Sequence, residues 1–133
     1  MKGIDTNILV RYILQDHPQQ YAQANSFIEK EKAAGRLIFI NGTVLCEFVW
    51  VLETAYDYLR LEIAPVIEKI LRTRQFCIYQ SEVLWQSLYG YQKEGADFAD
   101  HYIANLNMDN GCEYTVTFDK KAGRLKHFKK LDI

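Results

Sequence analysis

The sequence contains few of the residues that build covalent or metal-bound frameworks. Its 133 residues include only three cysteines, three histidines and two prolines. The cysteines Cys46, Cys77 and Cys112 are widely spaced and form no CxxC pair, and no histidine pair lies near them. This spacing argues against a disulfide framework and against a zinc site. We expect three small buried hydrophobic side chains in a reducing compartment.

Long hydrophobic runs and leader-like segments are also missing. No apolar run approaches the ~20 residues of a membrane-spanning helix, and the first predicted strand begins almost at Met1, which leaves no room for a signal peptide. No repeat or Pro/Gly/Ser-rich linker interrupts the chain. The length and the hydrophobic content of 49% predict a single domain over residues 1–133, soluble and cytoplasmic, without a membrane partner.

Charge is nearly balanced overall but unevenly distributed. The net charge is −1, yet the segment from residue 120 to residue 130 holds no acid and six basic residues, namely Lys120, Lys121, Arg124, Lys126, Lys129 and Lys130. Most such runs are solvated terminal segments. Beside an acidic site, the same run could instead follow a phosphate backbone.

Short apolar runs alternate with amphipathic stretches along the chain. Strands are predicted up to Ile4, at residues 37–40, 76–79 and 114–118, and near Leu131. Helices are predicted from about Ile8 to His17, and over residues 18–34, 44–56, 61–73, 81–95 and 97–109. This alternation predicts an α/β fold, a three-layer α/β/α sandwich with a central parallel sheet.

Two acids follow predicted strands directly. Asp5 ends the first strand and Asp119 ends the strand at residues 114–118. Ligands of parallel sheets bind at the carboxyl ends of the strands, so both acids are expected at one edge. Taken alone, Asp119 is more typical of a turn at the end of a strand.

Glu47 lies on the apolar side of a predicted helix. Helical spacing places it on one face with Val44, Phe48 and Val51, where an ionised side chain requires a partner. The partner could be a cation, or an arginine such as Arg11, or the acid could be held neutral.

Asp97 and Asp100 open the helix predicted at residues 97–109. Asp97 is well placed as its N-cap, and Asp100 resembles the acidic partner of a capping box. Asp100 also shares a face with Ala104 and Asn107, so we expect its side chain to point toward the sheet.

The four acids together favour a bound cation. Carboxylates brought to one point repel by ~1 to 4 kcal/mol per close pair, and oxygen ligands suit Mg²⁺ or Mn²⁺. Such an ion can activate water for displacement at phosphorus. Thr6, Asn7 and Thr117 lie beside the strand-end acids and could position a water or phosphate oxygen, although turn and capping roles are the common ones.

Four segments in order resemble the PIN-domain proteins of the VapC type, the ribonuclease toxins of toxin–antitoxin pairs. They are the segments at residues 4–10 (IDTNILV), 44–52 (VLCEFVWVL), 95–104 (GADFADHYIA) and 117–119 (TFD). The resemblance implies that Asp5, Glu47 and Asp100 are the central metal-binding acids, that Asp119 is the fourth and that Asp97 is accessory. Members often carry a second acid and an aromatic residue after TFD, where this chain has Lys121 and Ala122.

The resemblance also implies Mg²⁺- or Mn²⁺-dependent endonucleolytic cleavage of RNA and a cognate antitoxin. Lys120, Lys121 and Arg124 are then the candidates for RNA contacts. An antitoxin arginine among the carboxylates would be a plausible inhibitory device. Some of the many aromatic residues could line an antitoxin groove or a homodimer interface, although each is more typical of a core; they are Tyr12, Trp50, Tyr56, Tyr58, Trp85, Tyr89 and Tyr91.

Other phosphate-handling enzymes fit less well. A haloacid-dehalogenase-like phosphatase requires a second aspartate where Asn7 stands, and the glycine patterns of P-loop and dinucleotide-binding enzymes are missing. The remaining alternative is a non-catalytic PIN-like module that binds RNA or protein.

Overall fold

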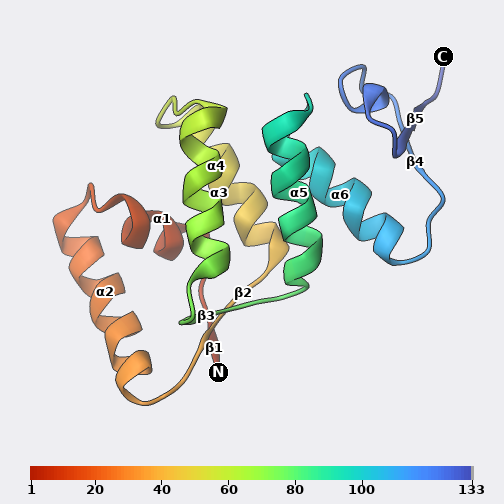
Figure 1. The fold of residues 1–133 in the computed structure, drawn as a ribbon. Coiled ribbons are helices and arrows are strands. Elements are labelled where there is room, and N and C mark those ends of the chain that lie inside the picture. The colour runs from red at the N-terminus through yellow and green to blue at the C-terminus, as the bar shows by residue number, and fades with distance from the viewer. Residues whose placement is uncertain (133) are drawn as a thin grey trace.

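Helices and short strands alternate in the computed structural model, which describes residues 1–132 (Figure 1). In chain order the elements are β1 (Lys2–Gly3), α1 (Thr6–Leu14), α2 (Pro18–Ala33), β2 (Ile38–Ile40), α3 (Gly42–Thr54), α4 (Arg60–Arg72), β3 (Phe76–Ile78), α5 (Ser81–Lys93), α6 (Phe98–Asp109), β4 (Thr115–Thr117), the 3₁₀ turn η1 (Ala122–Arg124) and β5 (Phe128–Lys130). Among these described elements, no helix has the length and apolar character needed to cross a membrane.

All strand pairs are parallel, as predicted, but they form two sheets. The first has the order β1-β2-β3, with Lys2 opposite Ile38 and Ile38 opposite Phe76. The second pairs β4 with β5, with Thr115 opposite Phe128. The α/β class is therefore confirmed and is consistent with a PIN-like α/β/α sandwich. The prediction that Asp5 and Asp119 follow strands of one sheet is wrong, because β1 and β4 lie in different sheets.

Polar caps fix where the N-terminal helices begin and end. The Asp5 carboxylate accepts a hydrogen bond from the Ile8 amide (3.1 Å) and begins α1. Gln15, at φ 56°, ends that helix before His17. His17 then caps α2 by accepting from the Gln20 amide (3.2 Å), with Pro18 in the first helical position.

Helix α3 carries much of the hydrophobic core. Its Leu45, Phe48 and Leu52 are completely buried, and each such side chain contributes about 1.5–3 kcal/mol by leaving water. The helix packs against α1, α4 and α6. A Cβ added at Gly42 would lie 2.3 Å from the Tyr102 ring, so a larger residue there would displace the end of that side chain.

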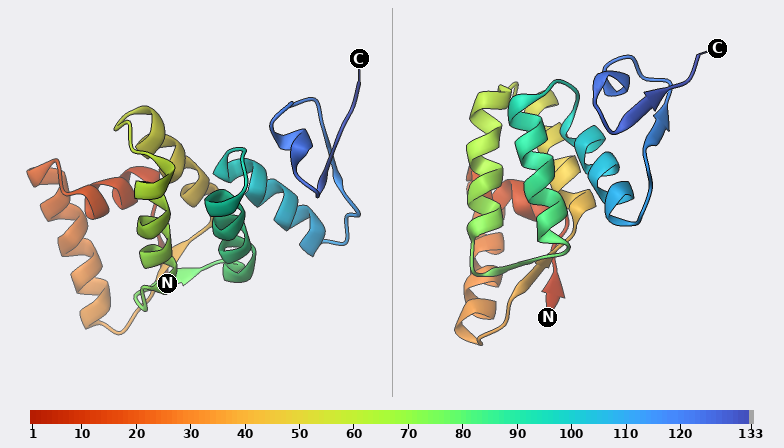
Figure 2. Two further views of the ribbon diagram at one scale, coloured as in Figure 1. Left: turned by 45° about the horizontal axis from the view of Figure 1, so that its top comes forward. Right: turned by 45° about the vertical axis from the view of Figure 1, so that its right-hand side comes forward.

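Residues 115–130, here called the C-terminal unit, lie beyond α6 and away from β1–β3 in every view (Figures 1 and 2). The Asn107 amide donates to the Thr115 hydroxyl (2.9 Å) and links the unit to α6. Ala122 and Leu125 are buried. Strand β4 remains open to solvent, with Val116 54% exposed and the adjoining Phe118 66% exposed.

The cysteines follow the prediction only in part. All three are free thiols, and Cys46 and Cys77 are partly buried. Burial, followed by the nearby Glu47 charge, raises the pKa of the Cys46 thiol to about 12. Cys112 is exposed, so the prediction that it is buried is wrong. It lies in the connection between α6 and β4, outside the packed core.

The aromatic residues are distributed between core and surface. Tyr91 is completely buried, whereas Trp50 is 63% exposed and Tyr89 is 54% exposed. Tyr12, Tyr56 and Trp85 are partly buried against the core. Core packing therefore accounts for some of the candidate interface aromatics but not for Trp50 or Tyr89.

Candidate functional site

Three of the predicted site residues meet where α1 begins beside α3. The Thr6 hydroxyl donates to a Glu47 carboxylate oxygen at 2.6 Å. Asp5 directly precedes Thr6, and its side chain is exposed while it caps α1. The hydrogen bond therefore holds Glu47 next to the end of β1, although Glu47 and Thr6 are 41 positions apart in the sequence.

The predicted burial of Glu47 is wrong, because its side chain is exposed. Val44 and Phe48 on the same helix are buried, and Glu47 lies at the rim of the core that they form. Arg11 is not its partner. That guanidinium instead donates to Gln20 (2.6 Å) and to the Tyr56 hydroxyl (3.2 Å). Glu47 thus needs no buried counter-ion and remains available to a ligand.

Asp97 and Asp100 form the predicted cap of α6. The Asp97 amide donates to an Asp100 carboxylate oxygen at 3.1 Å. Asp100 is partly buried. Burial raises the pKa of its carboxyl group, and the neighbouring charges of Asp97 and Asp119 raise that pKa further.

Asp119 lies in a turn, as the alternative interpretation of this residue predicted. Its carboxylate accepts from the Lys121 amide (3.0 Å), and its own amide donates to the Thr117 hydroxyl (3.0 Å). Thr117 thereby fixes the turn that presents Asp119, which is exposed. Asn7 is also exposed and lines a cavity together with Asp5.

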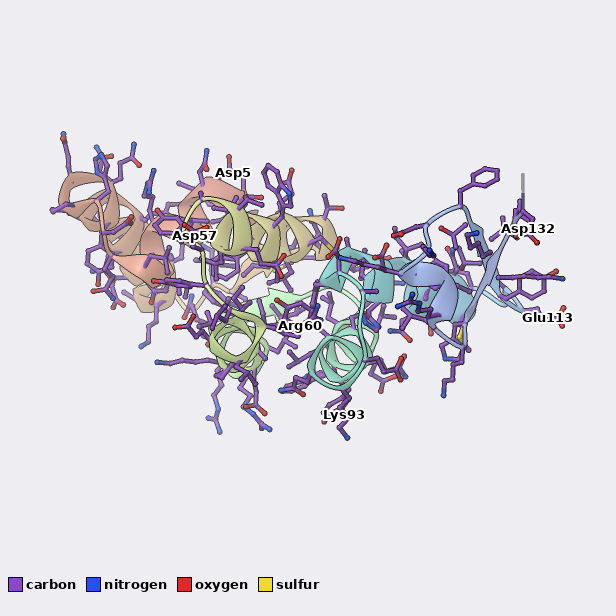
Figure 3. The ribbon with its side chains drawn as sticks, turned by 90° about the horizontal axis from the view of Figure 1, so that it is seen from above. Asp5, Asp57, Arg60, Lys93, Glu113 and Asp132 are labelled. Carbon is purple, nitrogen blue, oxygen red and sulfur yellow. The ribbon has the colours of Figure 1, made fainter. Side chains whose placement is uncertain are left out.

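The predicted acids come from two sets of elements. Asp5 and Glu47 lie at α1 and α3, whereas Asp97, Asp100 and Asp119 lie around α6 and the C-terminal unit. Figure 3 shows Asp5 well separated from Glu113 and Asp132, which flank that unit. Oxygen donors of this kind suit Mg²⁺ or Mn²⁺. In residues 1–132, however, no three Asp, Glu, His or Cys side chains lie close enough to hold an ion together.

Arg60 is a supporting residue that sequence reasoning missed. Its guanidinium donates to the carbonyl oxygens of Tyr91 (2.7 Å) and Ala96 (2.9 Å) and lies 4.2 Å above the Tyr91 ring. Ala96 has a φ of 76°, which is unfavourable for alanine. Arg60 therefore holds the strained turn that presents Asp97. It lies 36 positions from Ala96, so no local pattern could have indicated this role.

The predicted RNA-contacting residues lie beside the same turn. A cavity of about 630 Å³ is lined by Lys121 and Arg124, together with Arg60, Lys126, Glu94, Gly95, Ala96 and Leu125. Lys120 is exposed next to it in the chain. Four of these lining residues are basic and one is acidic, so the cavity favours an anion.

Comparison with known proteins identifies one curated relative. The chain is similar to a VapC ribonuclease. That protein, from Aquifex aeolicus (strain VF5), is 26% identical over 131 residues, which cover 98% of this chain and 92% of the relative. No protein-family model matches the sequence, and no solved structure matches it.

Proposed function

We propose that this protein is an Mg²⁺- or Mn²⁺-dependent endoribonuclease, the toxin of a type II toxin–antitoxin pair. The observation that carries the proposal is its similarity to a VapC ribonuclease over nearly the whole of both chains. The Thr6–Glu47 hydrogen bond supports it, because it joins Glu47 to the residue that follows Asp5 at the end of a parallel strand.

Asp5, Glu47, Asp100 and Asp119 would hold the ion, with Asp97 accessory. A bound ion would supply an activated water and charge neutralisation at phosphorus. Thr6 orients Glu47, Thr117 shapes the turn at Asp119, and Asn7 offers an amide beside Asp5.

The basic cavity gives the substrate a direction of approach. Lys121 and Arg124 line it next to Gly95 and Ala96, which immediately precede Asp97. A phosphate backbone bound there passes the acids of α6, and Lys120 extends the basic surface. We further propose cytoplasmic action, a homodimer and a cognate antitoxin that inserts an arginine among the carboxylates.

A second candidate function is a non-catalytic PIN-like module that binds RNA or protein. It is favoured because, among residues 1–132, no three Asp, Glu, His or Cys side chains lie close enough to hold an ion together. In that case Asp5, Asp97 and Asp119 serve only as caps and turn residues.

An RNA cleavage assay separates the two candidates. We expect purified protein to cut RNA in Mn²⁺ or Mg²⁺ and to stop in EDTA. Asp5→Asn should abolish cleavage. Asp57→Asn is the matched control, because Asp57 is exposed and its φ of 56° suits asparagine. Cleavage that survives Asp5→Asn would contradict the nuclease proposal.

A further inference from the structure

A cavity lies beside Asp5 where α1 and α2 pack side by side (Figure 1). Its volume is about 760 Å³, within the range of ~300–1,000 Å³ that is typical of pockets for small ligands. Asp5 is one of the residues that line it. A group bound in the cavity would therefore be a neighbour of the ion in the proposed site.

The walls of this cavity are largely apolar. Its wall residues Ile4 and Ala24 are buried. Phe27 is partly buried, and Ile8 is 36% exposed. Ala24 and Phe27 belong to α2, where helical spacing places them on one face with Gln20. Apolar walls of this kind suit the faces of a planar ring, whose polar edge must then meet polar groups.

Arg11 and Gln20 supply the polar groups of the cavity. The Arg11 Nε donates to the Gln20 side-chain oxygen at 2.6 Å, and its Nη1 donates to the Tyr56 hydroxyl at 3.2 Å. A guanidinium carries five N–H donors and no acceptor, so Arg11 has donors to spare. The Gln20 oxygen is occupied by the bond from Arg11, which leaves the NH₂ group of that amide for a ligand. Both residues thus offer hydrogen-bond donors.

We propose that this cavity binds one unpaired base of the RNA substrate, next to the bond that is cut, and that it selects guanine over adenine. The proposal rests on the proposed function, because RNA is the ligand. Proteins that read single-stranded RNA hold a splayed base between side chains and hydrogen-bond its edge. Because Asp5 lines the cavity, the base belongs to a nucleotide that adjoins the ion.

The donors of Arg11 and Gln20 decide which base fits. Guanine presents two acceptors, O6 and N7, on one edge, whereas adenine presents N7 beside an amino group. Both donors can therefore pair with guanine, but the amino group of adenine would face a donor and lose its partner. An apolar side chain from a protein partner would leave Arg11 and Gln20 unpaired beneath it, so a base is the better occupant.

Binding of short RNAs in EDTA tests the base preference without cleavage. Fluorescence anisotropy would compare an oligoadenylate with the same chain carrying one central guanosine. We expect the guanosine chain to bind about 10-fold more tightly, the usual scale of a base contact made through two hydrogen bonds. A third chain carries inosine, which keeps O6 and N7 but lacks the 2-amino group of guanosine, and it should bind like the guanosine chain.

Gln20→Glu changes the chemistry of the cavity and keeps its shape. A glutamate oxygen still accepts from Arg11, but the second oxygen replaces the free donor with an acceptor. This variant should lose the preference for guanosine. Gln19→Glu is the matched control, because it adds the same charge at an exposed position of the same helix, outside the residues that line the cavity. The control should keep the preference.

Several results would overturn the proposal. One is equal affinity of the wild type for the guanosine and adenosine chains, or no measurable affinity for either. Another is an inosine chain that binds like the adenosine chain, and this measurement needs no variant to fold. A preference that survives in Gln20→Glu, or that is also lost in Gln19→Glu, would show that the Gln20 amide does not select the base.

The affinities in EDTA separate this proposal from the proposed function. A protein that cuts RNA in Mn²⁺ but binds the guanosine and adenosine chains equally would keep the nuclease function and lose the base cavity. A protein that prefers guanosine in EDTA but cuts no RNA in Mn²⁺ would keep the base cavity and lose the nuclease function.

Discussion

The Thr6 hydroxyl donates to Glu47 at 2.6 Å and joins the first turn of α1 to α3. Thr6 directly follows the cap residue Asp5. The same short segment therefore caps a helix and orients a carboxylate from a distant part of the chain. In the proposed site, this bond would orient Glu47, and Glu47 and Asp5 would both be ligands of the ion.

Removing the hydroxyl should weaken catalysis more than folding. We expect Thr6→Val to lower cleavage by about 10–100-fold, the usual effect of losing a partner that orients a metal ligand. Thr6→Ser keeps the donor and should retain most of the activity. Steady-state cleavage rates in Mn²⁺, beside the melting temperature of each variant, provide the measurement. Equal losses of cleavage activity in both variants would show that the Thr6 hydroxyl does not support catalysis.

Metal should stabilise the folded protein, because the ion relieves repulsion that exists only when the acids are assembled. Mn²⁺ at 100 times its dissociation constant should add about 2.7 kcal/mol to the free energy of unfolding. Thermal unfolding with and without Mn²⁺ measures this effect. Asp5→Asn should lose the response and Asp57→Asn should keep it. A melting temperature indifferent to millimolar Mn²⁺ would contradict the proposed metal site.

Arg60 should be important for stability although it lies outside the carboxylate groups. Arg60→Ala removes two charge-assisted hydrogen bonds to the Tyr91 and Ala96 carbonyls, at a cost of about 2–4 kcal/mol. Urea unfolding measures the loss. Arg74→Ala, at an exposed position, is the control and should change the free energy of unfolding by less than about 0.5 kcal/mol. Similar midpoints for both variants would show that the Ala96 turn does not depend on Arg60.

Glu31 should make stability sensitive to acid. Its buried side chain pairs with Lys2 (2.6 Å) and Arg36 (2.7 Å). The bond from Lys2, with a further contribution from Arg36, lowers the pKa of Glu31 below its ordinary value of 4.5. A lowered pKa stabilises the fold fully above the ordinary value, and this stabilisation disappears as pH falls through the folded-state pKa.

Glu31→Gln should therefore lower the melting temperature at pH 7, and the difference from wild type should shrink as the pH falls below 4.5. Glu29→Gln, at an exposed position on the same helix, serves as the control and should leave the melting temperature nearly unchanged. A difference that stays constant down to pH 2 would show that ionisation of Glu31 is not the cause.

The local features of the fold were predictable because they depend on neighbouring residues. Asp97 caps α6 and Asn41 caps α3, where its side chain accepts from the Val44 amide (2.9 Å). Helical spacing also placed Phe48 in the core. The same spacing misplaced Glu47, because periodicity identifies a face of a helix but not where the covering layer ends.

The sequence by itself determined the alternation of strands and helices, the caps and the set of acids, since these follow from short-range spacing and backbone chemistry. Only the tertiary structure decided that Thr6 binds Glu47, that Arg60 supports the turn before Asp97 and that β4 lies apart from β1. These relationships join residues that are distant in the chain. They depend on which surfaces pack together, and no local pattern encodes that choice.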